Sequence, residues 1–198
     1  MARKYELKER AESVAQTRTR IVEATVELHE EIGPARTTIS AIADRASVQR
    51  LTIYRHFPDE HALFQACSAH WAERHPRPDP AKWELVANPE ERLRTALNDV
   101  YAFFRETEGM IGNLLRDLPE SPALRDVAEP FVQYWQDVRN VLTQGWKARG
   151  RRSDELHAVI GHAIQFDTWR SLTAREGLTD EAAADVMVEL ACTVGRGS

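Results

Sequence analysis

Basic and hydrogen-bonding side chains crowd residues 49–56. The guanidinium of Arg50 can donate two hydrogen bonds to O6 and N7 of a guanine, and Gln49 can pair with an adenine or a phosphate. Thr52 is short enough to reach a base edge or a thymine methyl group. This spacing predicts a short segment that reads base sequence in the major groove of DNA.

Neighbouring side chains are suited to phosphates. Tyr54 and His56, together with Thr37 or Thr38, can hold phosphate oxygens, which fixes the register on a duplex without reading its sequence. The full set of predicted DNA contacts is Arg36, Thr37, Thr38, Gln49, Arg50, Leu51, Thr52, Tyr54, Arg55 and His56.

Two short helices joined by a turn must position these side chains. Thr38 can cap the first helix with its hydroxyl. An apolar stripe at three-to-four spacing follows it, formed by Ile39, Ile42, Ala43 and Ala46. Val48 fills the space between the helices, and Ile53 and Phe57, four apart, face inward on the second one. The pattern predicts a helix-turn-helix, whose second helix suits the major groove. The alternative is a surface helix pair in an ordinary helical protein.

The same stretch resembles a known family. The run Ile42-Ala43-x-x-Ala46-x-Val48-x-x-x-Thr52-Ile53-Tyr54-Arg55-His56-Phe57-Pro58-Asp59 is similar to the DNA-binding domain of the tetracycline-repressor (TetR) family of bacterial transcription regulators. The resemblance covers roughly residues 16–66. It implies DNA-contacting roles for the positions named above, a bracing helix on either side of the motif, and a C-terminal part that pairs two subunits as a four-helix bundle.

Three positions depart from the family pattern. Family members usually have glycine where Ser47 stands, because the turn requires a left-handed backbone, and a serine there costs about 1 kcal/mol. Many have serine or threonine in place of Gln49, as the cap of the second helix. Glu60 replaces a lysine that commonly touches phosphate, so we expect no such contact here.

Composition and charge fit a water-soluble protein with a divided charge. Residues 1–57 carry ten Lys/Arg against eight Asp/Glu, whereas residues 58–198 carry sixteen against twenty-three. Acidity therefore lies mostly outside the motif, on which Arg36, Arg45, Arg50 and Arg55 gather. There is no apolar run long enough to cross a bilayer and no apolar signal core, so we expect a cytoplasmic protein without membrane contact. Cys67 and Cys192 are expected to be reduced core thiols.

The chain is expected to be all-α, with about nine to ten helices in two domains. Residues 1–16 form a flexible polar arm, which is either frayed or reaches a minor groove. Residues 17–75 form the DNA-binding domain, with its last helix over 59–75 and Asp59 as the cap of that helix, and a proline cluster at 76–80 marks the linker. Residues 76–198 form an effector-binding and dimerisation domain. Helices are expected to start at Asn88-Pro89 and at Ser121-Pro122, and long helices are expected over 130–149, 153–176 and 179–194.

Many aromatic side chains occur in the C-terminal part. A cavity among them would receive an apolar or aromatic effector, although the same residues could simply fill a core. Polar groups near residue 165, His162 among them, could orient a ligand or bond across a dimer, and these interpretations remain open. The candidate effector residues are Tyr101, Phe104, Phe131, Trp135, His162, Phe166 and Trp169.

The last two helices are expected to form a homodimer. They carry more small and branched apolar surface than one subunit can cover, in Ala158, Gly161, Ala182, Ala183, Val186, Met187, Leu190 and Val194. A two-fold dimer places two recognition helices about one DNA turn apart, roughly 34–36 Å, and requires a near-palindromic double-stranded operator.

An enzyme is not expected. The chain has no nucleophile elbow, phosphate loop or dinucleotide fingerprint, and its histidine pairs are five apart, on different helix faces. We therefore predict no catalytic residue, no metal and no cofactor, and a sequence-specific, ligand-responsive repressor. The competing interpretation is a helical ligand-binding or scaffold protein whose helix-turn-helix no longer binds DNA.

Overall fold

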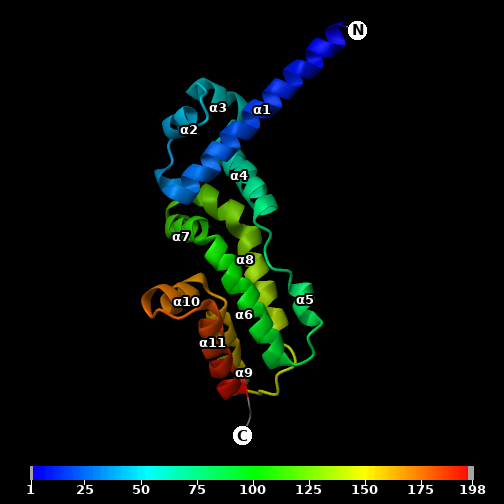
Figure 1. Cartoon of the computed structure of the whole chain (residues 1–198), viewed down its shortest axis with the longest axis vertical. Helices are drawn as coiled ribbons and strands as arrows, with labels where there is room; N and C mark the ends of the chain where they lie inside the picture. The colour runs from blue at the N-terminus through cyan, green and yellow to red at the C-terminus, as the bar shows by residue number, and fades with distance from the viewer. Residues whose placement is uncertain (1, 196–198) are drawn as a thin grey trace. The chain divides into compact units, whose positions relative to one another are not determined.

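The computed structural model describes the backbone of residues 2–195 and the side chains of residues 8–195. Within this range the chain is all-α and has no strand, which confirms the expected fold class (Figure 1). The α-helices are α1 (Ala2–Glu31), α2 (Ile39–Arg45), α3 (Arg50–His56), α4 (Glu60–Arg74), α5 (Pro80–Glu84), α6 (Pro89–Glu106), α7 (Glu108–Asp117), α8 (Pro122–Leu142), α9 (Arg151–Ala163), α10 (Phe166–Arg170) and α11 (Asp180–Gly195). Short helical turns lie at Pro34–Arg36, Leu118–Glu120 and Ser171–Arg175. No helix in the described range has the length and apolar character that a bilayer crossing requires.

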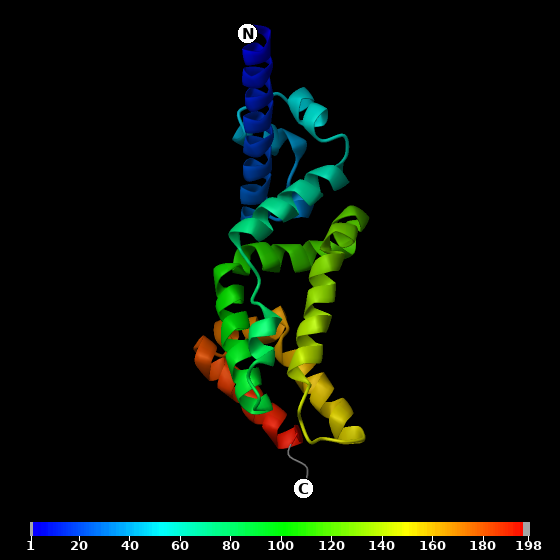
Figure 2. The ribbon, with the colours of Figure 1, turned by 90° about the vertical axis from the view of Figure 1, so that its right-hand side faces the viewer.

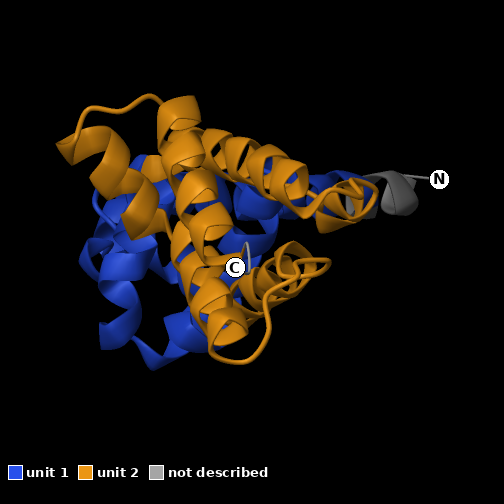
Figure 3. Cartoon of the chain, turned by 90° about the horizontal axis from the view of Figure 1, so that it is seen from below, with its two compact units in different colours: residues 1–76, 109–128 blue, residues 77–108, 129–198 orange. Residues whose placement is uncertain are grey.

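The chain divides into two compact units (Figure 3). Unit 1 contains residues 1–76 and 109–128, and unit 2 contains residues 77–108 and 129–198. The first boundary lies within the proline-rich segment. Residues 109–128, expected in the C-terminal domain, group with unit 1 because their side chains bond to the end of α1, as described below.

Unit 1 is built around α1 and α4, which pack against each other (Figure 2). Both helices contribute apolar side chains to one core. Helices α2 and α3 add the apolar residues whose spacing in the sequence predicted that they face inward. Buried members include Ile21, Ala24, Leu28, Ile42, Ala43, Ile53, Phe57 and Leu63. The helix expected over 59–75 is confirmed as α4, with Asp59 accepting a hydrogen bond from the amide of Ala62 at 2.7 Å.

The first helix begins much earlier than expected. Residues 2–16, predicted as a polar arm, are helical and continuous with the rest of the 30-residue α1. The segment is rich in alanine and in long charged side chains, which favour helix, and Lys8 pairs with Glu12 one turn later. The polar composition of residues 2–16 indicates that they have no buried side. A flexible arm and a fully exposed helix both fit that composition, so it could not distinguish them.

Side chains from α7 cap the carboxyl end of α1. Asn113 donates to the carbonyls of His29 and Glu30 at 3.0 and 2.8 Å, and Arg116 donates to that of Ile32 at 2.9 Å. These bonds satisfy carbonyls that lack partners within the helix. The carboxylate of the buried Asp117 accepts from the amide of Ala35 at 2.9 Å. Segment 113–117 is therefore an integral part of unit 1.

Unit 2 contains α5, α6, α9, α10, α11 and most of α8. Helix α11 packs against both α6 and α9. The predicted cap of α6 is confirmed, since Asn88 accepts from the amides of Glu90 and Glu91. Helix α5 was not expected. Its signal is Asp79-Pro80, an N-cap followed by proline at the first helical position.

Two long helices were predicted wrongly. The expected start at Ser121-Pro122 is confirmed, since Ser121 accepts a hydrogen bond from the amide of Leu124. The helix expected separately from Pro130 is part of the same helix α8, which continues through Pro130 and ends at Leu142, before the expected 149. The chain then turns through Gly145, which has a positive φ of 80°.

The helix expected over 153–176 ends at Ala163, and an extended Gln165 starts α10. In one continuous helix, residues 163, 164, 166, 168 and 169 would point to different sides, so they could not all face the core. The break at Gln165 changes the direction of the chain, and all five are buried.

Candidate DNA-binding site

The turn between α2 and α3 is a Schellman motif. The amide of Val48 bonds to the carbonyl of Ala43 at 2.9 Å, and that of Ser47 to the carbonyl of Asp44 at 3.2 Å. Ser47 adopts a φ of 53°, and no other non-glycine residue in the described chain has a positive φ. The expectation of a left-handed backbone at Ser47 is thus confirmed.

Helix α3 has one buried and one exposed side. Ile53 and Phe57 are 1% and 3% exposed, as their spacing predicted. Arg50, Leu51, Tyr54 and Arg55 are exposed, while Thr52 and His56 are half-buried. Leu51, at 57% exposure, offers an apolar group that can meet a thymine methyl. The exposed side thus combines two guanidinium groups, a phenol and an aliphatic side chain on two helical turns.

The two threonines before α2 are partly committed to the backbone. The hydroxyl of Thr38 accepts from the amide of Ala41 at 3.1 Å, which confirms the predicted cap. The hydroxyl of Thr37 donates to the carbonyl of Gly33 at 2.8 Å. Arg36 is exposed in the turn that precedes them. The hydroxyl of Thr37 would have to leave the carbonyl of Gly33 to donate to a phosphate, whereas that of Thr38 accepts within the protein and can still donate. The charged guanidinium of Arg36 is the strongest donor among these three candidate residues.

Arg45 does not belong with the DNA-facing cations, although the sequence places it on the motif. It bonds to Glu27 at 3.2 Å and to Glu31 at 2.8 Å, both on α1. These bonds keep the pKa of Glu31 below its usual value. Arg45 thereby ties α2 to α1, and the positive charge of the motif is carried by Arg36, Arg50 and Arg55.

The two other departures from the family pattern have local structural roles. Gln49 is the N-cap residue of α3 but its side chain makes no capping bond, which leaves the amide group free. Glu60 opens α4, where a negative charge is favourable beside the helix amino end. The carboxylate therefore serves the helix in place of a phosphate contact.

Six of the seven candidate effector residues meet in unit 2. The ring of Phe104 lies 5.3 Å from Trp135, 5.4 Å from Phe166 and 5.8 Å from Trp169, centroid to centroid. Tyr101 stacks on Phe104, and Phe131 packs against Trp135. Four of them, from α6 and α10, are at most 4% exposed, while Phe131 and Trp135 on α8 are half-buried. The aromatic rings therefore pack against one another, and the members that are more exposed to solvent are the two on α8.

His162 lies apart from these rings. Its side chain is exposed and bonds to the hydroxyl of Thr168 at 3.2 Å. In the single helix expected over 153–176, His162 and Phe166 would lie one turn apart on the same side. The break at Gln165 places them on different helices.

A polar network supports the aromatic cluster. Arg105 donates two hydrogen bonds to Asp180, at 2.6 and 3.2 Å, and the indole of Trp169 donates a third at 2.8 Å. Burial raises the pKa of Asp180, but the bonds from Arg105 and Trp169 outweigh it, and the net pKa lies below the usual value. Three helices, α6, α10 and α11, are thus joined through one carboxylate.

Comparison with known proteins identifies the motif. Residues 21–67 match the family model of bacterial regulatory proteins of the tetR family. The chain is similar in structure to a TetR-like transcriptional regulator from Rhodococcus sp. RHA1, with 20% identity, a TM-score of 0.61, and coverage of 88% of this chain and 93% of that one.

A second similar structure is the TetR family transcriptional regulator PfmR from Thermus thermophilus, at 18% identity, a TM-score of 0.60, and coverage of 90% and 95%. No curated protein matches the chain. At these identities the structures establish the shared fold, and the family model establishes the nature of the motif. Residues 21–67 therefore carry the helix-turn-helix domain of the tetR family of bacterial regulatory proteins, and the chain has the fold of these TetR-like transcriptional regulators.

Proposed function

We propose that this protein is a cytoplasmic repressor that binds a near-palindromic operator as a homodimer and releases it when a small apolar or aromatic effector binds unit 2. The observation that carries the proposal is the division of α3, with Ile53 and Phe57 in the core and Arg50, Leu51, Tyr54 and Arg55 exposed. A short helix anchored on one side and hydrophilic on the other fits a major groove.

The contacts divide into reading and positioning. Arg50 and Gln49 would pair with base edges, with Thr52 and Leu51 beside them. Arg36, Arg55, Tyr54 and His56, with Thr37 and Thr38, would hold phosphates. Because Arg45 is paired with carboxylates, each subunit brings few free cations, and we expect a modest dependence of affinity on salt.

Fluorescence anisotropy with the duplex upstream of the protein's own gene tests this. Arg50→Ala should weaken specific binding by about 5- to 150-fold, that is about 1–3 kcal/mol, and Tyr54→Ala should weaken it equally on all sequences. Arg149→Ala removes the same charge from an exposed site in unit 2 and should leave binding unchanged. Failure of the wild-type protein to bind at low salt would support the ligand-binding or scaffold alternative, which the pairing of Arg45 and the acidic Glu60 favour.

The dimer is proposed to form through α9 and α11. Val186 and Leu190, four apart on α11, are 45% and 44% exposed, and Ala158 on α9 is also exposed. Ala183 and Met187, which were expected in the interface, are buried within the subunit. A Val186→Asp, Leu190→Asp double variant should sediment as a monomer and lose operator affinity, whereas unchanged sedimentation would place the interface elsewhere.

Release requires an effector that prefers the DNA-free form, because equal affinity for both forms changes nothing. A preference of about 100-fold supplies about 2.7 kcal/mol per site. The half-buried Phe131 and Trp135 are the proposed entry side of the effector site. A thermal-shift screen with small apolar and aromatic molecules should find ligands whose effect is lost in Trp135→Ala.

A further inference from the structure

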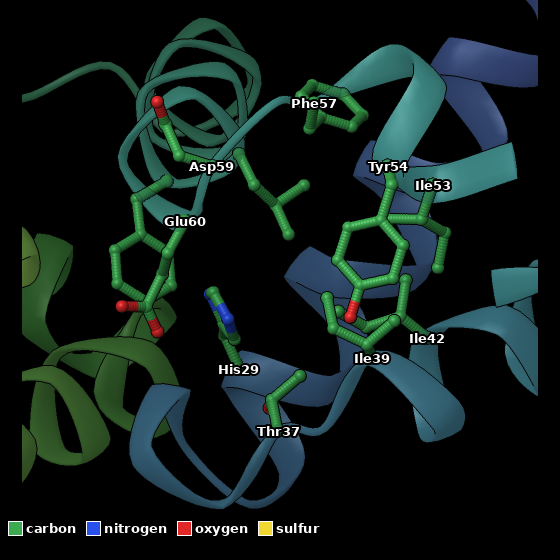
Figure 4. A pocket seen from close by; sticks show the side chains of 11 residues that line it. His29, Thr37, Ile39, Ile42, Ile53, Tyr54, Phe57, Asp59 and Glu60 are labelled. Carbon is green, nitrogen blue, oxygen red and sulfur yellow. The ribbon is translucent and has the colours of Figure 1, made fainter. Parts of the chain in front are cut away.

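Unit 1 contains a cavity of about 190 Å³ beneath the recognition helix (Figure 4). Its wall is mainly apolar, with Ile39, Ile42, Ile53, Phe57, Leu63 and Phe64 contributed by α2, α3, α4 and the residue that ends α3. The space lies among residues that the helix-turn-helix motif also uses.

One buried polar side chain points into this space. Figure 4 shows the imidazole of His29, at the end of α1, directed into the centre of the cavity. His29 is 5% exposed, and neither ring nitrogen has a hydrogen-bond partner among the described residues; its nearest aromatic neighbour is Phe64, edge-on at 5.6 Å. Burial lowers the pKa of His29 to about 4, against the opposing influence of Asp117, so the ring is neutral at pH 7.

A neutral imidazole offers one donor and one acceptor to a molecule in the cavity. A ligand with a single hydroxyl can form a hydrogen bond with one of the two ring nitrogens. The available volume sets the size, because a cavity of about 150 Å³ lined by Leu, Ile and Phe in another protein accepts benzene. We propose that this cavity binds a small neutral aromatic molecule with one hydroxyl, whose ring meets the isoleucines and whose hydroxyl bonds to His29.

The charge at the rim of the cavity further limits the chemical class of the ligand. Asp59 and Glu60 line the cavity and are exposed. Two carboxylates repel an anion, and burial of a carboxylate group in an apolar space is costly. A phenol is therefore accepted and a benzoate is excluded.

The site would communicate with DNA directly, a step that rests on the function proposed above. Tyr54 and Thr37, two of the predicted phosphate contacts, also line the cavity. A ligand in contact with them competes with the phosphates for the same side chains. By reciprocity, the ligand weakens DNA binding by the factor by which DNA weakens ligand binding.

Methyl NMR on the full-length protein with labelled isoleucines tests the site without DNA. Addition of phenol should shift the δ1 methyl signals of Ile39, Ile42 and Ile53 in a saturable manner. Ile21 and Ile111, which are buried in unit 1 and do not line the cavity, serve as internal references. Benzoate at the same concentration should not shift the signals of Ile39, Ile42 or Ile53. Absence of saturable shifts at Ile39, Ile42 and Ile53, or shifts confined to Ile160 and Ile164 in unit 2, would overturn the proposal.

The role of His29 is tested by substitution. His29→Phe keeps an aromatic ring of similar size and removes both nitrogens, so phenol affinity should fall at least about fivefold while toluene affinity is retained. His29→Gln, which keeps a donor and an acceptor, should retain phenol binding better than His29→Phe. Equal phenol affinity in the wild type and in a folded His29→Phe would overturn the hydrogen bond. If neither variant folds, the wild-type methyl titration still decides the site.

The two proposals fail separately. If phenol binds but the wild-type protein binds no duplex, the cavity site stands and the repressor function falls. If the duplex binds but the isoleucine methyls do not respond to phenol, the repressor stands and the cavity site falls. If both bind and phenol leaves the DNA affinity unchanged, the proposed competition through Tyr54 and Thr37 is wrong.

Discussion

Helix α3 and the aromatic cluster of unit 2 place their candidate functional side chains in opposite ways. On α3 the candidate side chains are exposed, and the apolar residues that hold the helix are different ones. In the cluster the candidates Tyr101, Phe104, Phe166 and Trp169 are themselves the core. Binding and folding can therefore be changed independently on α3, whereas in the cluster a substitution affects both.

The largest contrast is expected between two aromatic residues. Phe104→Ala should lower the free energy of unfolding by about 3–5 kcal/mol, because the ring is 1% exposed and touches several others. Tyr54→Ala, at a 52% exposed ring, should change it by no more than about 0.5 kcal/mol. Urea denaturation measures both. Similar losses in the two variants would remove the distinction between the regions.

Gly33 tests how firmly unit 1 holds the motif. Its φ of 94° is accessible mainly to glycine, and a Cβ there would meet the side chains of Arg116 and Asp117. Gly33→Ala should lower the free energy of unfolding by about 2 kcal/mol. Gly150 also has a positive φ, but the space around it is open, so Gly150→Ala should lower the free energy of unfolding by less. Equal costs in urea denaturation would show that contact with α7 contributes nothing.

The Arg105–Asp180–Trp169 network should give unit 2 a pH dependence. Asp180→Asn should lower stability at pH 7 by about 1–2 kcal/mol, since it weakens charged hydrogen bonds that are partly exposed. Because the folded pKa lies below the ordinary value of 3.8, this contribution is present above that pH.

The contribution should disappear as the pH falls through the folded pKa, so the wild type and Asp180→Asn should converge in acid. Thermal unfolding between pH 7 and about 2 measures this, because the loss begins near the ordinary value of 3.8 and continues through the folded pKa. Asp126→Asn, at an exposed position on α8, is the control and should show no such convergence. A difference that stays constant to the end of this range would exclude linkage to Asp180.

The smallest effect concerns the turn of the motif. Ser47→Gly should raise the free energy of unfolding by about 1 kcal/mol, because glycine accepts the φ of 53° without strain. Ser40→Gly, within α2, should instead lower it by about 0.5–1 kcal/mol. Chemical denaturation of both variants gives the comparison. A loss of stability in Ser47→Gly would mean that the serine side chain stabilises the turn.

Local patterns predicted unit 1 better than unit 2. The spacing of Ile53 and Phe57 fixes which side of α3 is buried, and caps such as Thr38 and Asp59 act within a few residues of themselves. Because these interactions join residues only a few positions apart, the local sequence is enough to predict them.

What could not be predicted depends on residues far apart in the chain. Arg45 appeared to be a DNA-facing cation because its partners Glu27 and Glu31 lie on another helix. The break at Gln165 has no glycine or proline to mark it and follows from the burial of Phe166 and Trp169 against other helices. The cavity around His29 likewise requires the packing of four helices.

The capping of α1 by α7 limits how this protein can be engineered. A hybrid regulator made by cutting the chain after residue 76 would transplant α1 without Asn113, Arg116 and Asp117. The carbonyls of Glu30 and Ile32 and the amide of Ala35 would then be left to water, whereas the carbonyl of His29 would keep its bond from the amide of Gly33. A portable DNA-reading module has to include residues 109–128, grafted as a second, non-contiguous piece.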